Sequence, residues 1–541
     1  MNSLKNLIII ILAGVASAGC KKLDLAPTDR FSDLTFWTTD ANVYSALNNN
    51  YSLMYNSQLF FYNESLSDNA YSSTGDYNLV ASGNATSGTS KFQGDWAYYY
   101  STLKSCNLFL ENVDKNKTLS ADVIARLKAE TRFIRAFELF NLAKWYGDVP
   151  LADHDITADE AKQISRAPKA TVIKFVTDEL EAVAAVLPSK DQLSANENGR
   201  ITKGAALALE ARVLLYQGDR MADVVTICEK LMNDQADNGQ YALVSNYSDL
   251  FSNPTVNKTN SESMLSIQYV PAIRTWNEFW DFAPRSVGGR VSSMAPTQEL
   301  VDDYIMLNGK GIKDAGSGYD ESNPYTNRDP RLTATVVYDG YKWTKPDGSI
   351  KIIYIKPGSD PDRSAPDEYN PASQSSSPTG YYWRKYFDPG ALANFVSGNN
   401  IHLIRYAEVL LDYAEAKNSL GQMNAEVWDK TIMPLRQRAG FTDPGALNYP
   451  GNTDMTNIIR KERRAEFAME GLRTDDVRRW KIAGNVMNGY AHGAKFGDPS
   501  VDNGYIRVQK RQFNASRDYL WPIPSSEISL DNKLTQNPGY N

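Results

Sequence analysis

Three glutamates at helical spacing, Glu462, Glu466 and Glu470, are the first carboxylates to consider for catalysis. A pair of carboxylates can hydrolyse a glycosidic bond, one as general acid and one as base or nucleophile. The cations close to them in the sequence are Arg460, Arg463, Arg464, Arg473, Arg478 and Arg479. Carboxylates four residues apart usually form ion pairs with such neighbours, and nearby arginines lower the pKa that a general acid needs raised. We therefore expect a structural ion-pair network and not a catalytic pair.

Other catalytic and metal-binding patterns are missing from the sequence. Its histidines, His154, His402 and His492, lie far apart, and no phosphate-binding, zinc-protease, nucleophile-elbow or EF-hand motif occurs. Acidic loop residues could hold a structural Ca²⁺, but they lack a recognised ligand spacing. These residues are Asp360, Asp362 and Asp367. The sequence therefore predicts no enzyme, no catalytic residue and no cofactor, and it indicates a structural Ca²⁺ only weakly.

Two polar segments rich in aromatic residues, 62–100 and 270–290, could bind a sugar. The apolar C–H faces of a sugar pack on aromatic rings, while its hydroxyls need planar polar partners. The candidate ligand-binding residues are Asp68, Asn69, Tyr71, Tyr77, Trp96, Arg274, Trp276, Asn277 and Trp280. The alternative is that these rings belong to the core or cover a partner surface. If they bind a sugar, replacing Trp276 or Trp280 by alanine should weaken binding without changing the melting temperature.

Other tryptophans and tyrosines have different expected places. Trp37, Trp145 and Trp480 are expected in the core. Should the two segments fail as a site, the next region to consider surrounds Tyr381, Tyr382 and Trp383.

Length and composition are those of a large soluble globular protein. The chain has 541 residues, of which 42% are hydrophobic and 22% charged, with a net charge of −7. This excludes a disordered chain and a multi-span membrane protein. The acidic balance also argues against nucleic-acid binding, which needs clustered Lys and Arg.

The N-terminus has the pattern of an export signal. Lys5 precedes an apolar stretch at 7–16, which is too short to span a bilayer, and small residues then lead to Cys20. Cys20 after small residues resembles a lipobox, so we expect a lipoprotein signal peptide at 1–19, lipidation of Cys20 and a tether at 20–35. An ordinary signal peptide is the alternative. Cys106 and Cys228 are expected to be buried free thiols.

Apolar periodicity predicts a mostly α-helical fold. Helices are expected at 41–55, 126–146, 170–187, 203–217, 220–233, 403–420 and 424–439. Several end at glycine, and their alanine-rich faces suit the close packing of tetratricopeptide-like hairpins. Residues 62–92 look like a long loop. Short strands are expected at Ser263–Val270, Ala334–Tyr338 and Ile352–Ile355, in a loop-rich, partly β insertion at about 240–400.

Six blocks of sequence together resemble one protein family. They are LDLAPTDRFSDLTFWTTDANVYSALNNNY after Cys20, AETRFIRAFELFNLAKWYGDVPL (129–151), RITKGAALALEARVLLYQGD (200–219), IRYAEVLLDYAEA (404–416), IIRKERRAEFAMEGLRTDDVRRW (458–480) and the terminal YLWPIPSSEISLDNKLTQNPGYN. In this order they resemble the SusD/RagB family of surface nutrient-binding lipoproteins. Segments 62–100 and 270–400 match no block.

The resemblance implies a single SusD-like domain over 36–541, with a helical scaffold at about 36–240 and 400–541 and the ligand region at about 240–400. It implies a lipoprotein of the Gram-negative outer membrane that faces outward. Such a protein binds glycans without cleaving them and delivers them to a SusC-like TonB-dependent transporter. Two alternatives stay open, a RagB-like peptide-binding subunit and a secreted glycoside hydrolase.

Overall fold

The computed structural model describes residues 36–540, apart from 365, 374, 392–395 and 452. The predicted signal peptide, tether and lipidation site at Cys20 lie outside the described residues. In the described part, no helix is long and apolar enough to cross a membrane.

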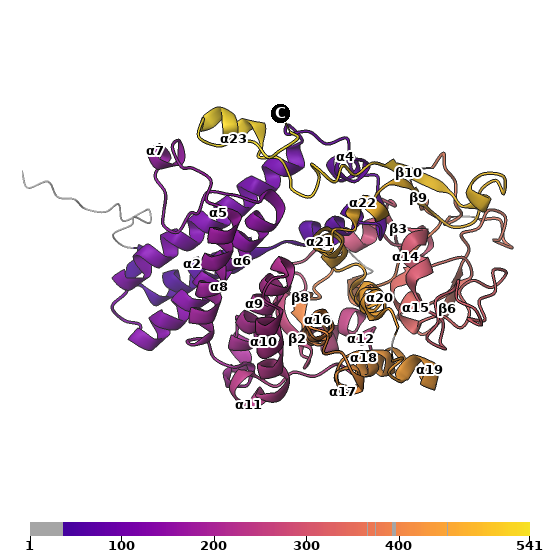
Figure 1. Cartoon of the computed structure of the whole chain (residues 1–541), viewed down its shortest axis with the longest axis horizontal. Coiled ribbons are helices and arrows are strands. Elements are labelled where there is room, and N and C mark those ends of the chain that lie inside the picture. The colour runs from indigo at the N-terminus through magenta and orange to yellow at the C-terminus, as the bar shows by residue number, and fades with distance from the viewer. Residues whose placement is uncertain (1–35, 365, 374, 392–395, 452, 541) are drawn as a thin grey trace, which may run out of the picture.

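Long helices packed against one another make up one side of the molecule (Figure 1). They are α2 (Asp40–Met54), α5 (Ser90–Asn112), α6 (Ala121–Tyr146), α8 (Lys169–Ala184), α9 (Lys203–Gln217), α10 (Met221–Asn233) and α16 (Tyr406–Ser419). The helices α5, α6, α8, α9, α10 and α16 pack against each other in that order. This arrangement confirms the predicted mostly α-helical, tetratricopeptide-like scaffold.

The ends of these helices follow from local sequence. The hydroxyl of Ser120 accepts a hydrogen bond from the amide of Val123 at the start of α6, and Thr202 caps α9 in the same way. Gly147 and Gly218 end the two helices with positive φ angles of 76° and 82°, which glycine adopts without strain. The glycines therefore end the helices where the sequence predicted.

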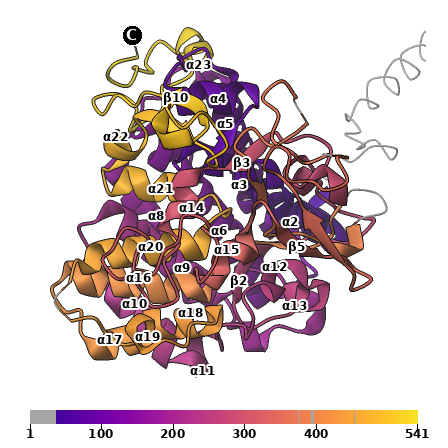
Figure 2. The ribbon, with the colours of Figure 1, turned by 90° about the vertical axis from the view of Figure 1, so that its right-hand side faces the viewer.

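Shorter helices connect the scaffold to the rest of the molecule. They include α3 (Ser57–Tyr62), α4 (Gly75–Ser82), α7 (Ala158–Ala161), α11 (Gln235–Asn238), α12 (Asp249–Ser252), α13 (Pro254–Lys258), α14 (Gln298–Asp303), α15 (Pro330–Thr335), α17 (Ala425–Lys430), α18 (Ile432–Ala439), α19 (Pro444–Leu447), α20 (Met455–Phe467), α21 (Leu472–Arg479), α22 (Ala483–Val486) and α23 (Ser525–Leu530). Figure 2 faces the side of the molecule that carries α14, α15 and α20.

Strands pair two by two, always antiparallel. The pairs are β1 (Ala70–Ser72) with β3 (Met294–Pro296), β2 (Ser263–Ile267) with β8 (Ile401–Arg405), β4 (Val336–Val337) with β7 (Tyr382–Trp383), β5 (Tyr341–Thr344) with β6 (Ile350–Ile353), and β9 (Gly489–His492) with β10 (Arg507–Arg511). Most of these strands lie in the loop-rich region, while β1, β8, β9 and β10 come from outside it.

Two of the segments that differ from the sequence prediction are 62–92 and 403–420. Residues 62–92 contain α4, β1 and a 3₁₀ helix at Asn63–Leu66, and 62–70 are buried throughout, so this segment is not a long surface loop. The predicted helix at 403–420 begins only at Tyr406. Its first residues belong to β8, because Ile401 and Ile404 pair with Ile267 and Leu265 of β2.

Buried aromatic rings join the chain ends to the scaffold. Trp145 of α6 stacks on Trp521 with ring centroids 4.2 Å apart, and both are almost fully buried. Trp37 is buried as predicted, whereas Trp480 is only half-buried. Cys106 and Cys228 are buried and unpaired, as expected, and burial raises the pKa of each thiol.

Candidate functional site

The three spaced glutamates of α20 and its C-terminal turn lie in a buried ion-pair network. Glu462 contacts Arg331 and Arg436 at 2.7 and 2.8 Å. Glu466 contacts Arg331, Arg405 and Arg438, while Glu470 contacts Arg405 and Lys385. Each of the three carboxylates is almost fully buried and is paired with at least two cations.

Ion pairing accounts for the geometry of these glutamates. Burial favours the neutral acid, but the guanidinium groups of Arg438, Arg405 and Arg331 outweigh it and hold the pKa of Glu466 well below its usual range. A carboxyl group with such a low pKa has no proton to donate at neutral pH. The predicted ion-pairing is confirmed, although most partners are distant in sequence and not the neighbouring arginines.

Most of the arginines that are close in sequence to these glutamates pair with other carboxylates. Two of them hold the predicted ligand-binding residues Asp68 and Asn69. Arg464 and Arg473 pair with Asp68 at 3.0 and 2.8 Å, and Asn69 accepts a hydrogen bond from Arg464 at 2.7 Å. Asp68 and Asn69 are both buried. Their polar groups are therefore used within the protein and do not face a ligand.

Trp276 and Trp280 are also core residues. Their exposed fractions are 3% and 1%. The indole nitrogen of Trp276 donates to the carbonyl of Asn399 at 2.8 Å, and its ring lies 4.9 Å from Phe61. The expectation that these two rings offer an exposed face is wrong, because Trp276 packs on Phe61 and Tyr386 and Trp280 packs on Phe279 and Phe387.

The remaining sequence candidates are dispersed. Tyr77 is buried under Lys91, whose ammonium lies 4.3 Å from the ring centroid, and Trp96 lines a separate cavity of about 430 Å³ beside α5 and α7. Tyr71 and Arg274 are half-buried, and Asn277 is exposed. The structure therefore does not gather the predicted set into one site.

A different cavity combines mostly half-buried aromatic rings with polar side chains. We call it the tyrosine cavity, and its volume is about 440 Å³. Its aromatic lining consists of Tyr319, Tyr325, Tyr338, Tyr381, Phe496 and Tyr505, and its polar lining includes Gln298, Glu321, Asn323, Asp339, Lys356 and Lys495. All of these rings are half-buried except Tyr381, which is buried. Apolar ring faces beside amide, carboxylate and ammonium groups suit a sugar.

Strand pairing and one arginine position these rings. Val337 of β4 pairs with Tyr382 of β7, which brings the adjacent Tyr338 and Tyr381 to the same end of the strand pair. The guanidinium of Arg328 donates to the carbonyls of Pro324 and Tyr304 at 2.7 Å each, and so holds the loop that carries Tyr319 and Tyr325.

Hydrogen bonds order the tyrosine cavity further. Tyr325 stacks on Tyr338 with centroids 4.0 Å apart, and its hydroxyl lies 3.3 Å from that of Tyr381, which in turn donates to Gln298 at 2.6 Å. Burial raises the pKa of Tyr325 and Tyr381, so these hydroxyls stay protonated at neutral pH. At the rim, Lys495 pairs with Glu321.

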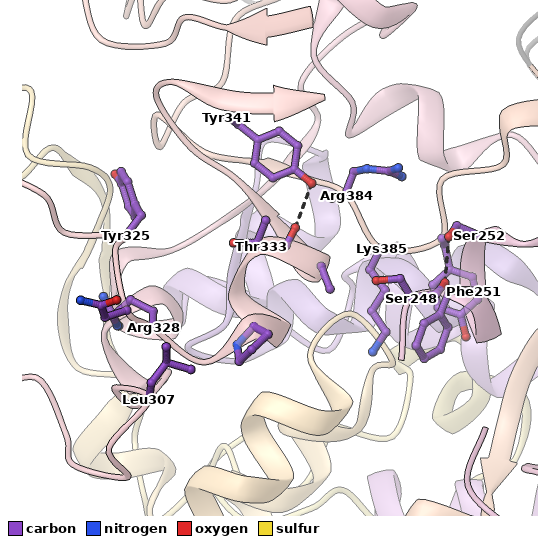
Figure 3. A pocket seen from close by; sticks show the side chains of 14 residues that line it. Ser248, Phe251, Ser252, Leu307, Tyr325, Arg328, Thr333, Tyr341, Arg384 and Lys385 are labelled. Atoms are coloured by element: carbon purple, nitrogen blue, oxygen red, sulfur yellow. Dashed lines mark hydrogen bonds between the residues drawn. The ribbon is translucent and has the colours of Figure 1, made fainter. Parts of the chain in front are cut away.

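A second cavity, the arginine cavity, shares Tyr325 with the first and has a volume of about 480 Å³ (Figure 3). Its ionisable cations are Arg328, Arg384 and Lys385. Tyr341 on its wall donates to the carbonyl of Thr333 at 2.9 Å. Burial, assisted by the charge of Arg405, lowers the pKa of Lys385 to about 8, although Glu470 opposes this shift.

The sequence contains a signal for the tyrosine cavity that the prediction missed. Segment 318–327, GYDESNPYTN, places two tyrosines among polar, turn-forming residues, as in the two segments that were chosen. Of the reserve region, Tyr381 lines the cavity, whereas Tyr382 and Trp383 are fully buried.

The acidic loop residues proposed for Ca²⁺ are engaged separately. Asp360 accepts from the hydroxyl of Ser364 at 2.8 Å, and Asp367 accepts from the amide of Ser286 at 3.0 Å. Among the residues that the structure describes, no group of three or more His, Cys, Asp or Glu side chains is arranged to hold a metal ion.

The fold is a scaffold of helical hairpins that carries an irregular, partly β region. Two family models match the chain. The model of the SusD family matches residues 228–540, and the model described as "Starch-binding associating with outer membrane" matches residues 6–215. The first match covers more than half of the sequence. The chain therefore belongs to the SusD family.

Individual relatives agree with this assignment. "SusD-like protein P2" of Formosa agariphila is 24% identical over 566 residues and covers 100% of both chains. A SusD-like carbohydrate binding protein from Bacteroides fragilis superposes with a TM-score of 0.80 at 30% identity, covering 93% of this chain and 100% of its own. Surface glycan-binding protein A from Bacteroides fluxus shares the fold with a TM-score of 0.66 at 21% identity, over 93% of this chain and 100% of its own.

Proposed function

We propose that the protein is a non-catalytic, surface-exposed glycan-binding subunit of a nutrient-uptake complex. It captures an oligosaccharide in the tyrosine cavity and delivers it to a SusC-like TonB-dependent transporter in the outer membrane. Lipidated Cys20 anchors it there, facing the cell exterior.

The tyrosine cavity is the observation that carries this proposal. Aromatic rings from three separate segments, at 319–338, 381 and 496–505, surround one cavity together with amide and carboxylate groups, and all of them except buried Tyr381 are half-buried. Family membership and relatives that are named for carbohydrate or glycan binding support a sugar as the ligand. The ion-paired state of Glu462, Glu466 and Glu470 supports binding without hydrolysis.

A glycan array probed with soluble protein that lacks residues 1–20 tests the proposal. We expect one class of oligosaccharide to bind, with no release of reducing ends on prolonged incubation. If only peptides from a matched peptide panel bind, the RagB-like alternative replaces this proposal. Steady release of reducing ends would instead establish the hydrolase.

Truncating Tyr338 should weaken binding of the glycan found on the array. Stacking on one ring contributes on the order of 1 kcal/mol, so Tyr338→Ala should raise Kd about fivefold, and Tyr505→Ala should have a similar effect. Tyr44, an exposed tyrosine on α2, provides the matched control as Tyr44→Ala. Calorimetric Kd and melting temperature are measured on the same samples. Unchanged affinity in both cavity variants would remove the tyrosine cavity from the proposal.

Lipid anchoring has its own test in cells. Cys20→Ala should prevent acylation and release the protein from the membrane fraction, because stable anchoring needs the acyl chains. Fractionation and incorporation of labelled palmitate are compared with the wild type. A Cys20→Ala protein that still sediments with membranes, beside a wild type without label, contradicts the anchor.

A further inference from the structure

The arginine cavity has a one-sided charge. Among the described residues, its ionisable lining consists of cations, apart from the tyrosines, and includes no aspartate or glutamate. This contrasts with the net charge of −7 of the chain and with the tyrosine cavity, where Glu321 and Asp339 accompany Lys356 and Lys495. A concave site with cations alone concentrates field lines that attract an anion.

Arg384 is one of two cations in this cavity that form no ion pair with a carboxylate of the described residues; the other is Arg328. The guanidinium of Arg384 lies over the rings of Trp343 and Phe387, 4.5 Å from each centroid. The two rings hold the guanidinium in place through cation–π contacts. Because the side chain is already held in place, its N–H groups can donate hydrogen bonds to an oxyanion without a large loss of side-chain entropy.

The other two cations have different roles. Arg328 donates hydrogen bonds to backbone carbonyls and is paired with no carboxylate in the described part of the chain. Its positive charge is therefore not neutralised and adds to the positive potential of the cavity. Lys385 is held by Glu470 at 2.6 Å and is largely neutralised by it. Arg384, supported by the field of Arg328, is thus the expected contact for an anion.

The two cavities meet at Tyr325, which lines both. In Figure 3, Tyr325 and Arg328 lie on one side of the arginine cavity, and Arg384 lies across it beyond Tyr341. Thr333 and Asn327, which also line this cavity, are exposed, so it is open to solvent. An oligosaccharide stacked on Tyr325 can therefore extend into it.

We propose that the arginine cavity binds the carboxylate or sulfate group of an acidic saccharide whose neighbouring sugar ring lies in the tyrosine cavity. This inference rests on the proposed function and narrows its ligand to anionic glycans. The oxyanion would form charge-assisted hydrogen bonds with Arg384, which are shorter and stronger than those between neutral groups.

Matched oligosaccharides test the anion requirement. The probes are an oligogalacturonide and its carboxyl-reduced form, and a sulfated galactan oligosaccharide and its desulfated form. We expect the wild type to bind at least one acidic form about tenfold or more tightly than its neutral partner. The pair that shows the difference distinguishes carboxylate from sulfate. Raising the ionic strength from about 0.05 M to about 0.5 M should weaken the acidic form alone.

Variants assign the effect to Arg384. Arg384→Gln should lose the tenfold preference and leave neutral binding unchanged, while Arg384→Lys should keep part of it. Arg220→Gln, an exposed arginine of the α10 start, is the control. The salt dependence of the wild type needs no variant, so the inference stays testable if Arg384→Gln melts early.

The outcomes separate the two proposals. If neutral glycans bind as tightly as acidic ones and salt has no effect, the anion inference fails while the proposed function stands. If no glycan of either kind binds, both fail. A salt-sensitive preference that persists in Arg384→Gln places the anion elsewhere and overturns the assignment to this cavity.

Discussion

We expect Glu466→Gln to lower the free energy of unfolding by about 3–5 kcal/mol, the usual cost of removing one member of a buried ion pair. Glu466 faces Arg331, Arg405 and Arg438, and Arg405 and Arg438 also contact Glu262. Neutral glutamine keeps the shape of the side chain but leaves guanidinium charge uncompensated at a buried site. Denaturant unfolding of both proteins measures the difference.

The pH dependence of this variant follows from the depressed pKa of Glu466. A carboxyl group with a lower pKa in the folded state contributes stability above its unfolded pKa of about 4.3, and loses it as pH falls below that value. The gap between wild type and Glu466→Gln should therefore be full at neutral pH and narrow in acid. Glu426→Gln, at an exposed site on α17, should change stability by less than about 0.5 kcal/mol. A fully stable Glu466→Gln protein would contradict the network account.

Trp280→Ala and Trp276→Ala should each cost about 3–5 kcal/mol of stability, because both side chains are buried and their removal leaves a cavity. Trp276 also leaves the carbonyl of Asn399 without its donor. Glycan affinity of the folded protein should stay unchanged. This is the reverse of the expectation from sequence, in which these rings bind ligand.

A neighbouring exposed residue controls for the location of the change. Ile273 is 85% exposed in the same segment, so Ile273→Ala should leave the melting temperature close to that of the wild type. Melting by circular dichroism and affinity by calorimetry are compared for all three variants. If both tryptophan variants melt like the wild type and bind weakly, their assignment to the core is wrong.

Local patterns were enough to predict the helical scaffold. The helix at 203–217 is found with the same bounds, since its alanines, its threonine cap and Gly218 all act within a few residues. The strand at β8 was missed because Ile401 to Arg405 become extended only by pairing with β2, which is far away in the sequence. Tertiary pairing overrides local helix propensity there.

The site was predicted less well than the scaffold, because a polar residue in the sequence does not reveal whether a distant side chain of the same protein pairs with it. Asp68 and Asn69 looked like surface residues, yet Arg464 and Arg473 bury them from the other end of the chain. Tyr319 and Tyr505 are far apart in sequence and meet only through the arrangement of loops. An aromatic residue can belong either to the core or to a binding site, and the sequence alone does not distinguish the two until the arrangement of the loops is known.

A crystal structure with the tightest-binding array glycan tests the central claim most directly. We predict a sugar ring packed on Tyr325 or Tyr338, with its hydroxyls hydrogen-bonded to polar side chains of the tyrosine cavity. Sugar density confined to the separate cavity at Trp96, with the tyrosine cavity free of sugar, would contradict the account.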